Sequence, residues 1–332
     1  MNVNFVALFA VVAMTLLGQK KAKAMTPAPK PTPGPGPTVP ATLRLGPIVS
    51  AFPETDHEAR NRMVLDAVRA GREDPIAWAM VTSLGTGPLA GYELDVPVMA
   101  DALKIEGIRI STSYETAQWI ADALSARSPA DGALVMLTPW LDAIVFENAD
   151  APLAYTTSQE LSNKAVTPRT SQMVEVSQKV DRKLEALRAL GTLPPVPLVA
   201  NVGKNWVLTR RFLEPGVHPE TNVPHAQAAA NQGFYPPKNA YNPIQYRGVA
   251  HNLKHVDYSQ VLRFLGPVSY LREPGVERDQ PGIPIQTSQL LQDENLGPLL
   301  SGQAGLQRGK MVGEGFLPFD RHPAVPELGK LV

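Results

Sequence analysis

Apolar positions recur at helical spacing in three stretches of the chain. Residues 113–126, residues 170–190 and the stretch that follows Thr55 all repeat an apolar position every three or four residues. Thr55 and Glu58 also have the spacing of a capping box, which predicts that the first helix begins there. The stripe of the longest predicted helix consists of Met173, Val176, Val180, Leu184 and Leu187, and Gly191 follows it as a stop signal.

Shorter stretches predict strands, and the two kinds of element mix without strict alternation. Residues 92–98 alternate between apolar and other side chains, and residues 76–82 form an apolar run of strand length. We therefore expect an α+β or α/β fold in which a mixed small sheet has flanking helices. The remaining expectations are strands at 107–110, 196–200, 206–209 and 256–265, a buried helix at 134–146, an interrupted helix at 288–300, and loop over most of 210–248.

The first residues suggest either a signal peptide or a membrane anchor. Residues 5–18 form an uncharged apolar run, shorter than the ~20 residues of a spanning helix and closer to a signal-peptide core. Residues 22–24 match an A-x-A cleavage site. The lysines that follow the run, Lys20, Lys21 and Lys23, instead favour a short anchor with the remainder on the cytoplasmic side. Both alternatives stay open, and the protein is expected to be membrane-anchored or secreted.

A proline-rich tract separates this apolar helix from the rest of the chain. Residues 26–40 read TPAPKPTPGPGPTVP, a composition that favours extended polyproline II and a semi-rigid spacer. The predicted organisation is a signal peptide or anchor at 1–24, a linker at 25–54, a globular α/β domain at 55–305 and a Gly/Pro-rich tail at 306–332.

Composition narrows the classes of function. The 332 residues include 31 basic and 31 acidic side chains, so the chain lacks the positive footprint that duplex nucleic acid requires. The cysteine count is zero, which excludes disulfide scaffolds, thiolate zinc sites and cysteine nucleophiles. The hydrophobic content of 44% suffices for a core.

The densest patch of chemically competent residues is 251–259, which reads HNLKHVDYS. His251 and His255 are four residues apart, the spacing that places two imidazoles on one face of a helix in zinc motifs, with Asp257 as a third ligand. Alternatively, Ser259 is a nucleophile, with His255 or His251 as base and Asp257 as orienter. A third interpretation is a polar surface loop without chemistry.

The same patch carries a resemblance. Residues 255–259 together with Arg263 resemble a segment of a family of bacterial and phage-encoded proteins without an assigned activity, Asp-Tyr-Ser-His-Gly-x-Arg-Leu-Val preceded by a histidine. Residues 112–124, 203–210 and 290–301 are also similar to that family, so that the likeness spans about 56–305. The resemblance implies a shared fold rather than a reaction, and it adds Arg263 to the candidate site.

The chain departs from this pattern directly after the serine. Gln260 and Val261 stand where the family has His-Gly, so any chemistry that depends on that histidine is lost here. The pattern also resembles the Ser-His-Gly-Cys-x-Arg signature of L,D-transpeptidases, but a chain without cysteine cannot run that reaction. The short apolar segment with its lysine cluster is similar to those of small phage-encoded membrane proteins.

These observations give two expectations about function. In the first, the chain is a cell-envelope or virion-associated protein that acts on or binds cell-wall material, as a hydrolase if Ser259 or a metal such as zinc at His251 and His255 is active. In the second, it is a non-enzymatic structural or adhesive protein of a phage or bacterial surface. The expected partners are a membrane, through the N-terminus, and a cell-wall polymer.

Overall fold

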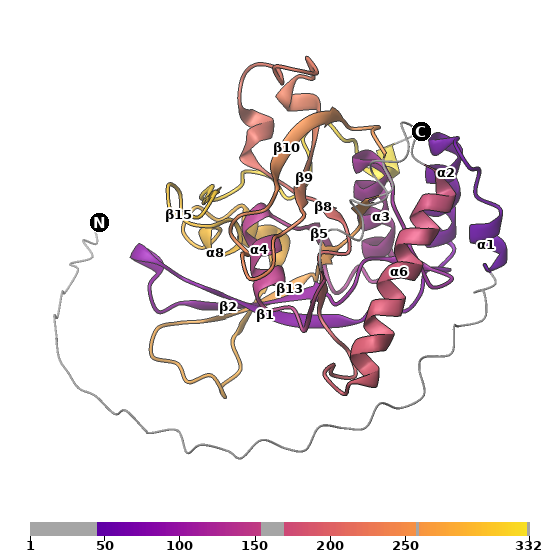
Figure 1. Cartoon of the computed structure of the whole chain (residues 1–332). Helices are drawn as coiled ribbons and strands as arrows, with labels where there is room; N and C mark the ends of the chain where they lie inside the picture. Colours follow the sequence, from indigo (N-terminus) through magenta and orange to yellow (C-terminus); the bar gives the residue numbers. More distant parts are fainter. Residues whose placement is uncertain (1–44, 154–168, 257–258, 331–332) are drawn as a thin grey trace. The chain divides into compact units, whose positions relative to one another are not determined.

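Two β-sheets with helix α4 (Pro139–Glu147) between them organise the protein (Figure 1). The computed structural model describes residues 45–153, 169–256 and 259–330. These residues belong to one compact unit, Leu45–Val332. Helix α4 contacts β1 in one sheet and β9 in the other, and its residues 139–146 are all buried. The predicted mixture of helices and sheets is therefore confirmed, whereas the apolar N-terminal segment and most of the linker lie outside the described residues.

In the first sheet, the hydrogen-bonded path runs β14-β13-β2-β12-β5. Strands β13 and β12 pair with the two ends of β2 along one side, and β1 pairs with its other side. Strands β1 and β2 form a hairpin in which Trp78 lies opposite Met99 and Leu84 opposite Glu93. The predicted strands at 76–82 and 92–98 are thus confirmed with small shifts of their ends. The strands are β1 (Trp78–Leu84), β2 (Glu93–Met99), β5 (Val135–Met136), β12 (Phe264–Leu265), β13 (Val268–Arg272) and β14 (Ile283–Gln286).

The second sheet has the order β10-β9-β8-β11. Strand β11 is parallel to β8, and the other neighbours are antiparallel. Two of its strands, β9 and the beginning of β10, interrupt the segment 210–248, most of which lies outside strands as predicted. The strands are β8 (Lys204–Trp206), β9 (Ala228–Gly233), β10 (Gln245–Asn252) and β11 (Gln260–Val261).

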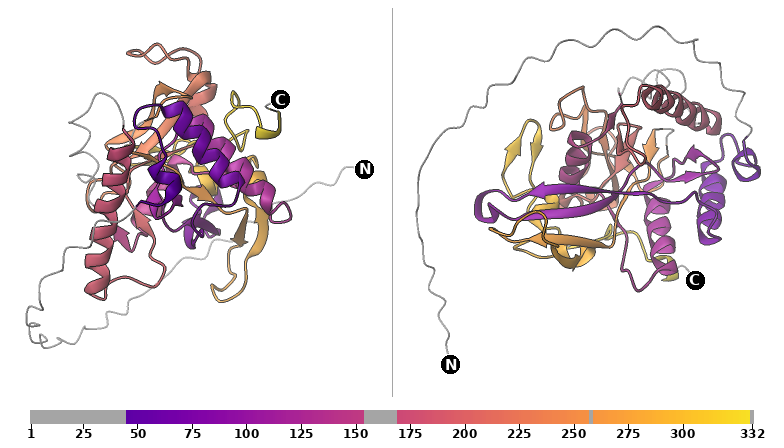
Figure 2. Two further views of the ribbon diagram at one scale, coloured as in Figure 1. Left: turned by 90° about the vertical axis from the view of Figure 1, so that its right-hand side faces the viewer. Right: turned by 90° about the horizontal axis from the view of Figure 1, so that it is seen from below.

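Helices α2 (His57–Arg69) and α3 (Tyr114–Arg127) pack against each other, as the left view of Figure 2 shows. The predicted Thr55 cap is wrong by one residue, because the Asp56 carboxylate accepts the Ala59 N–H at 2.9 Å and α2 begins after it. Ser113 caps α3 in the same way through the Thr116 N–H. Helix α6 (Thr170–Ala189) confirms the longest predicted helix almost to the residue.

The predicted helix over 134–146 is wrong in its first third. Residues 135–136 form β5, and Thr138 then caps α4 by accepting the Leu141 N–H at 3.2 Å. Pro139 stands in the first turn, where its missing N–H costs no hydrogen bond, so the chain changes from strand to helix at this point. The expected interrupted helix consists of α7 (Thr287–Leu291) and α8 (Pro298–Ser301).

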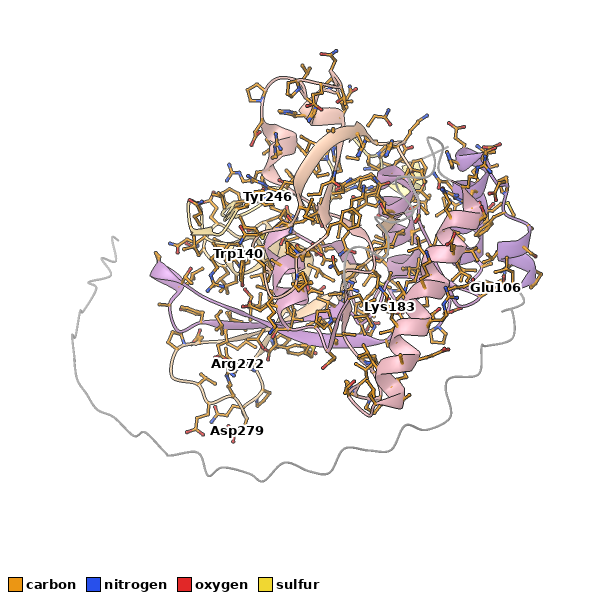
Figure 3. The ribbon with its side chains drawn as sticks, in the orientation of Figure 1. Glu106, Trp140, Lys183, Tyr246, Arg272 and Asp279 are labelled. Carbon is orange, nitrogen blue, oxygen red and sulfur yellow. The ribbon has the colours of Figure 1, made fainter. Side chains whose placement is uncertain are left out.

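The segments before and after the predicted domain contribute to the described fold. Short helix α1 (Pro47–Ser50) buries Val49, and the Glu106 carboxylate accepts its Ile48 and Val49 N–H groups at 3.1 and 2.9 Å (Figure 3). Towards the C-terminus, Leu317 and His322 are fully buried. The remaining short elements are β3 (Lys104–Ile105), β4 (Ile108–Arg109), β6 (Ala151–Pro152), β7 (Val199–Ala200), β15 (Gln307–Arg308) and β16 (Met311–Val312).

Candidate functional site

One face of the second sheet carries a row of polar side chains. Residues directly opposite each other in a ladder point to the same face, and so do alternate residues of one strand. The pairing therefore places His251, Asn231, Lys204 and Gln260, one from each strand, on a common face. The register pairs are His251 with Ala229, Gly248 with Asn231, Trp206 with Asn231, Lys204 with Gly233, and Gln260 with Lys204.

Asn231 is the most unusual member of this row. Its side chain is fully buried, and neither the oxygen nor the nitrogen of its amide has a hydrogen-bond partner. A Cβ atom at Gly248, across the ladder, would lie 3.1 Å from the Asn231 side-chain oxygen. An unsatisfied buried amide costs roughly 1–3 kcal/mol, so the Asn231 amide does not stabilise the fold through hydrogen bonds to the described residues.

Ser259 and Arg263 are buried beside this sheet. The Ser259 carbonyl accepts the backbone N–H of Lys204 at 2.6 Å, and the residue is 1% exposed. Arg263 is 2% exposed and donates through Nη2 to the Val199 carbonyl, while Nε and Nη1 have no hydrogen-bond partner. Burial lowers the pKa of the Arg263 guanidinium, against the opposing effect of the Asp101 carboxylate. A substrate carbonyl could reach Ser259 only if surrounding residues moved.

The two predicted metal ligands lie in contact with each other. The His251 and His255 rings are stacked, with centroids 3.8 Å apart and planes 4° from parallel. Imidazole lone pairs lie in the ring plane, so the lone pairs of two stacked rings run side by side and do not converge on one ion. A shared metal therefore requires one ring to rotate. Asp257 lies outside the described residues, and among those that the structure describes no group of three His, Cys, Asp or Glu side chains could hold a metal.

A third histidine approaches this stack. His57, in the first turn of α2, lies close enough to His255 for their charges to interact. Burial, and next the nearby Arg60 guanidinium, lower the pKa of His57. Its Nδ1 has no hydrogen-bond partner. The stacked histidines thus lie next to the N-terminal end of α2, a neighbour that sequence spacing did not predict.

Beside the histidines, α2 and α3 enclose a cleft of about 240 Å³. The segment after β10 closes its end, where the Leu253 carbonyl accepts the Glu115 N–H at 3.1 Å. The lining residues are Glu58, Asn61, Arg62 and Leu65 from α2, Ser113, Glu115, Thr116 and Trp119 from α3, and Lys254.

The chemistry of this cleft is polar, balanced in charge and partly aromatic. Two carboxylates, Glu58 and Glu115, face two cations, Arg62 and Lys254. Burial raises the pKa of Glu115; Lys254 acts against that shift and Glu58 adds to it. The Trp119 indole N–H is fixed by the Pro326 carbonyl at 3.0 Å, which holds the ring in place at the cleft.

Asn61 adds a buried hydrogen-bond acceptor to the wall of the cleft. The residue is 8% exposed, and its side-chain oxygen has no hydrogen-bond partner. Because this oxygen is itself buried, a ligand donor reaches it only when the Asn61 side chain turns towards the cleft. The fixed Trp119 ring offers a ligand an apolar contact in the cleft, and the Asn61 side chain offers a polar one.

The opposite face of the second sheet holds a hydrogen-bonded polar network around Asp142, although the side-chain oxygens of Asn205 and Gln232 have no hydrogen-bond partner among the described residues. Asp142 of α4 accepts hydrogen bonds from Tyr235 Oη at 2.5 Å and from Asn205 Nδ2 at 2.6 Å. Gln232 donates to Tyr235 Oη and to the Pro139 carbonyl, both at 2.6 Å. Burial raises the pKa of Asp142 to about 6, although these donors act against the shift. This network ties α4 to the sheet and is closed to ligands.

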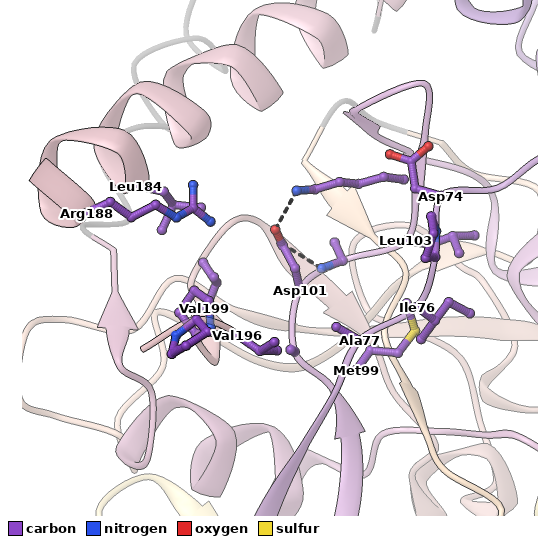
Figure 4. Close-up of a pocket in the computed structure, with 16 residues that line it drawn as sticks. Asp74, Ile76, Ala77, Met99, Asp101, Leu103, Leu184, Arg188, Val196 and Val199 are labelled. Carbon is purple, nitrogen blue, oxygen red and sulfur yellow. Dashed lines mark hydrogen bonds and ion pairs between the residues drawn. The ribbon is translucent and has the colours of Figure 1, made fainter. Parts of the chain in front are cut away.

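A further charged cluster lines a cavity of about 210 Å³ next to α6 (Figure 4). Arg109 is 2% exposed and binds Asp101 through Nε at 2.9 Å and Asp181 through Nη1 at 2.8 Å. Lys104 binds Asp101 at 2.9 Å. Burial disfavours the charge of Asp101, but the Arg109 guanidinium outweighs it and holds the pKa below its usual range. These charges satisfy one another and fix α6 to the sheet.

Comparison of the chain with protein-family models, with curated proteins and with solved structures gives no match. The site therefore rests on geometry and chemistry. Sequence patterns located the histidine patch, but they missed the cleft, whose residues come mainly from two separate helices, α2 and α3. A usable signal is that Glu58 and Glu115 both fall in the first turn of a capped helix.

Proposed function

We propose that the chain is a cell-envelope or virion-associated protein whose domain binds cell-wall glycan in the cleft between α2 and α3. The observation that carries the proposal is the lining of that cleft, where a fixed indole ring lies among polar side chains of balanced charge. An aromatic ring packs on the C–H face of a sugar, while amides and carboxylates bind its hydroxyls.

The charge balance separates a glycan from other ligands. A phosphate or nucleic acid would meet Glu58 and Glu115, and a cationic ligand would meet Arg62 and Lys254. A neutral polyhydroxyl ligand encounters no net repulsion. It can also donate to the Asn61 oxygen, which has no partner among the described residues, once that side chain turns towards the cleft.

Binding is favoured over hydrolysis by the burial of Ser259 and by the stacked geometry of His251 and His255. The enzymatic form of the proposal uses Ser259 with His255, or a metal on His251 and His255. It is tested by incubating the full-length chain with purified peptidoglycan, with and without chelator. Release of soluble fragments that is lost in His255→Ala would establish hydrolysis and overturn the non-catalytic form.

The N-terminal segment and linker motivate the proposed location at a membrane or envelope. Among residues 45–153, 169–256 and 259–330, no helix combines the length and apolarity needed to cross a bilayer. Residues 1–44 lie outside that range. An accessibility assay on the full-length chain in its host membrane tests whether the domain faces the cell wall, which binding to it requires.

Binding itself is tested by co-sedimentation of the full-length chain with insoluble peptidoglycan. Trp119→Ala is expected to weaken binding about tenfold or more, because truncating an aromatic anchor typically costs at least ~1.4 kcal/mol. Tyr270→Ala is the matched control, since Tyr270 is an aromatic residue 40% exposed on the first sheet. Equal retention of the wild type and Trp119→Ala would refute the cleft as the glycan site.

A further inference from the structure

Two edge strands of the first sheet, β14 and β1, differ in how they are protected from pairing with a further strand. Strand β14 has Pro284 in its middle, and proline is a common device that blocks pairing at a sheet edge. Strand β1, which pairs only with β2, reads WAMVTSL. It contains neither a charge nor a proline, so no such device guards it.

The hydrogen bonds at the two ends of β1 define which backbone groups face outward. The Ala77 carbonyl accepts the Ala100 N–H, and the Gly85 N–H donates to the Tyr92 carbonyl. The register between these pairs is unbroken, so odd-numbered residues of β1 bond to β2. The N–H and C=O groups of Trp78, Met80, Thr82 and Leu84 therefore point away from the sheet. Within the described part of the chain, no backbone hydrogen bond outside the β1–β2 ladder engages them.

The side chains of these same residues lie on the uncovered face of the sheet. Trp78, Met80 and Leu84 are 39%, 52% and 56% exposed, whereas Val81 and Ser83 are buried towards α4 and α8. The right view of Figure 2 shows this face, with β1 and β2 in front and no helix drawn over them. An unpaired edge and an apolar face thus coincide on one strand.

We propose that β1 pairs with β1 of a second copy of this chain in antiparallel orientation, with the two-fold axis at Val81. Outward-facing residues then form hydrogen-bonded pairs, Trp78 with Leu84 of the second copy and Met80 with Thr82 of the second copy. Each end of the joint places an indole against a leucine, a favourable cross-strand pair. The result is one continuous sheet through two protomers.

Charge favours an identical strand as the occupant. Strand β1 has no charged side chain, so two copies meet without like-charge repulsion. On the next strand, Glu93 is neutralised by Arg272 at 3.2 Å and by Arg278 at 2.8 Å. Asp95 pairs with Arg272 at 2.6 Å. The acidic groups nearest the joint are therefore already compensated within each protomer.

The absence of cysteine from the chain permits a direct test of this register. Full-length Trp78→Cys and Leu84→Cys chains are prepared separately, mixed and oxidised. The mixture is expected to form a disulfide-linked dimer, whereas each variant alone is not, because equivalent positions lie about 20 Å apart in an antiparallel pair of this register. Leu190→Cys, at a 73% exposed position outside the strand, controls for random collision.

Each other outcome overturns the proposal. Self-linking of Trp78→Cys alone would indicate parallel pairing, and linking of the Leu190→Cys control at the same rate would indicate collision. The mass of the unmodified full-length chain in detergent provides an independent measurement. We expect a dimer, and a monomer for Thr82→Pro, which removes an outward N–H but no backbone hydrogen bond to β2; Thr82→Ala, which loses the same side-chain bond to Asp95 but keeps the N–H, is the matched control and is expected to remain dimeric. A monomeric wild type, or a Thr82→Pro chain that remains dimeric, contradicts the pairing.

Discussion

The two sheets differ in which of their side chains they bury. The first sheet buries apolar side chains such as Val96 and Val98 and exposes Trp78 and Met80 to solvent. In the second sheet, β9 is buried along its whole length and yet contributes Asn231 and Gln232 to the interior. Buried polar groups are costly unless they are bonded, whereas exposed apolar side chains are ordinary. The difference supports the two proposals, which give the first sheet a role in association and place the ligand site beside the second sheet.

Within the second sheet, the face that contacts Asp142 is expected to carry the largest stability effect. Asp142→Ala leaves the donors of Tyr235 and Asn205 without their acceptor inside the core. We expect a loss of about 3–5 kcal/mol in the free energy of unfolding, measured by urea titration at pH 7. The counterpart in the first sheet is Thr82→Ala, which removes a part-buried hydrogen bond to Asp95 of 2.7 Å and is expected to cost at most ~1 kcal/mol. Equal losses of stability in Asp142→Ala and Thr82→Ala would show that the two sheets do not differ in this respect.

The pH dependence of stability is the next largest effect. His322 is fully buried, its Nε2 hydrogen-bonded to the Ala228 carbonyl of β9, and burial lowers its pKa to about 4. Below its ordinary pKa of 6.5 the unfolded chain binds this proton more strongly, so His322 makes stability rise with pH between about 4 and 6.5. Asp142 acts in the opposite sense. Its raised pKa of about 6 makes stability fall with rising pH between 3.8 and 6.

These two contributions offset each other in the wild type and are separated by mutation. In His322→Gln, the Asp142 contribution is no longer offset by His322, and by itself it lowers stability by about 2 kcal/mol from pH 4 to pH 6. In Asp142→Asn, stability is expected to rise over the same range. Urea titrations at pH 4, 5 and 6 measure both slopes, and two parallel profiles would contradict the assignment.

Asn231, on the other face of the second sheet, is expected to respond in the opposite direction from Asp142. Asn231→Leu replaces a buried amide without hydrogen bonds by an apolar side chain of similar size. We expect stability to be unchanged or to increase by about 1 kcal/mol in the same urea titration. A loss of 3 kcal/mol or more in the free energy of unfolding would mean that the Asn231 side chain stabilises the fold as Asp142 does.

The smallest effect is expected at the rim of the cleft. Arg62 and Glu58 are 3.7 Å apart, with side chains 67% and 71% exposed. Arg62→Ala is expected to change the free energy of unfolding by less than ~0.5 kcal/mol, because exposed ion pairs contribute little. A larger loss in thermal or urea unfolding would show that the rim supports the fold as well as the site.

Elements whose pattern is local were predictable from sequence, and those decided by tertiary contacts were not. The stripe from Met173 to Leu187 defines α6 because every third or fourth residue faces the core. Strand β9, AAANQG, has no β-branched or aromatic residue, so propensity favours a loop, and only its burial between β8 and β10 makes it a strand.

The candidate site was predictable only in part for the same reason. The spacing of His251 and His255 correctly drew attention to the segment beside the cleft, although it suggested a helix where the structure has the end of β10. The partners of that segment, Glu58 and Trp119, are brought there by the packing of α2 on α3. No spacing rule relates residues on two separate helices. The catalytic set that includes Asp257 stays a prediction.

The central claim is that the cleft between α2 and α3 binds a neutral glycan, and calorimetric titration with a soluble cell-wall oligosaccharide tests it most directly. The full-length chain is expected to bind saturably with one site per protomer, and the affinity is expected to change less than about twofold when salt is raised, because the lining charges balance. Trp119→Ala should weaken binding about tenfold or more. Absence of binding in the wild type, or identical affinity in Trp119→Ala, would contradict the account.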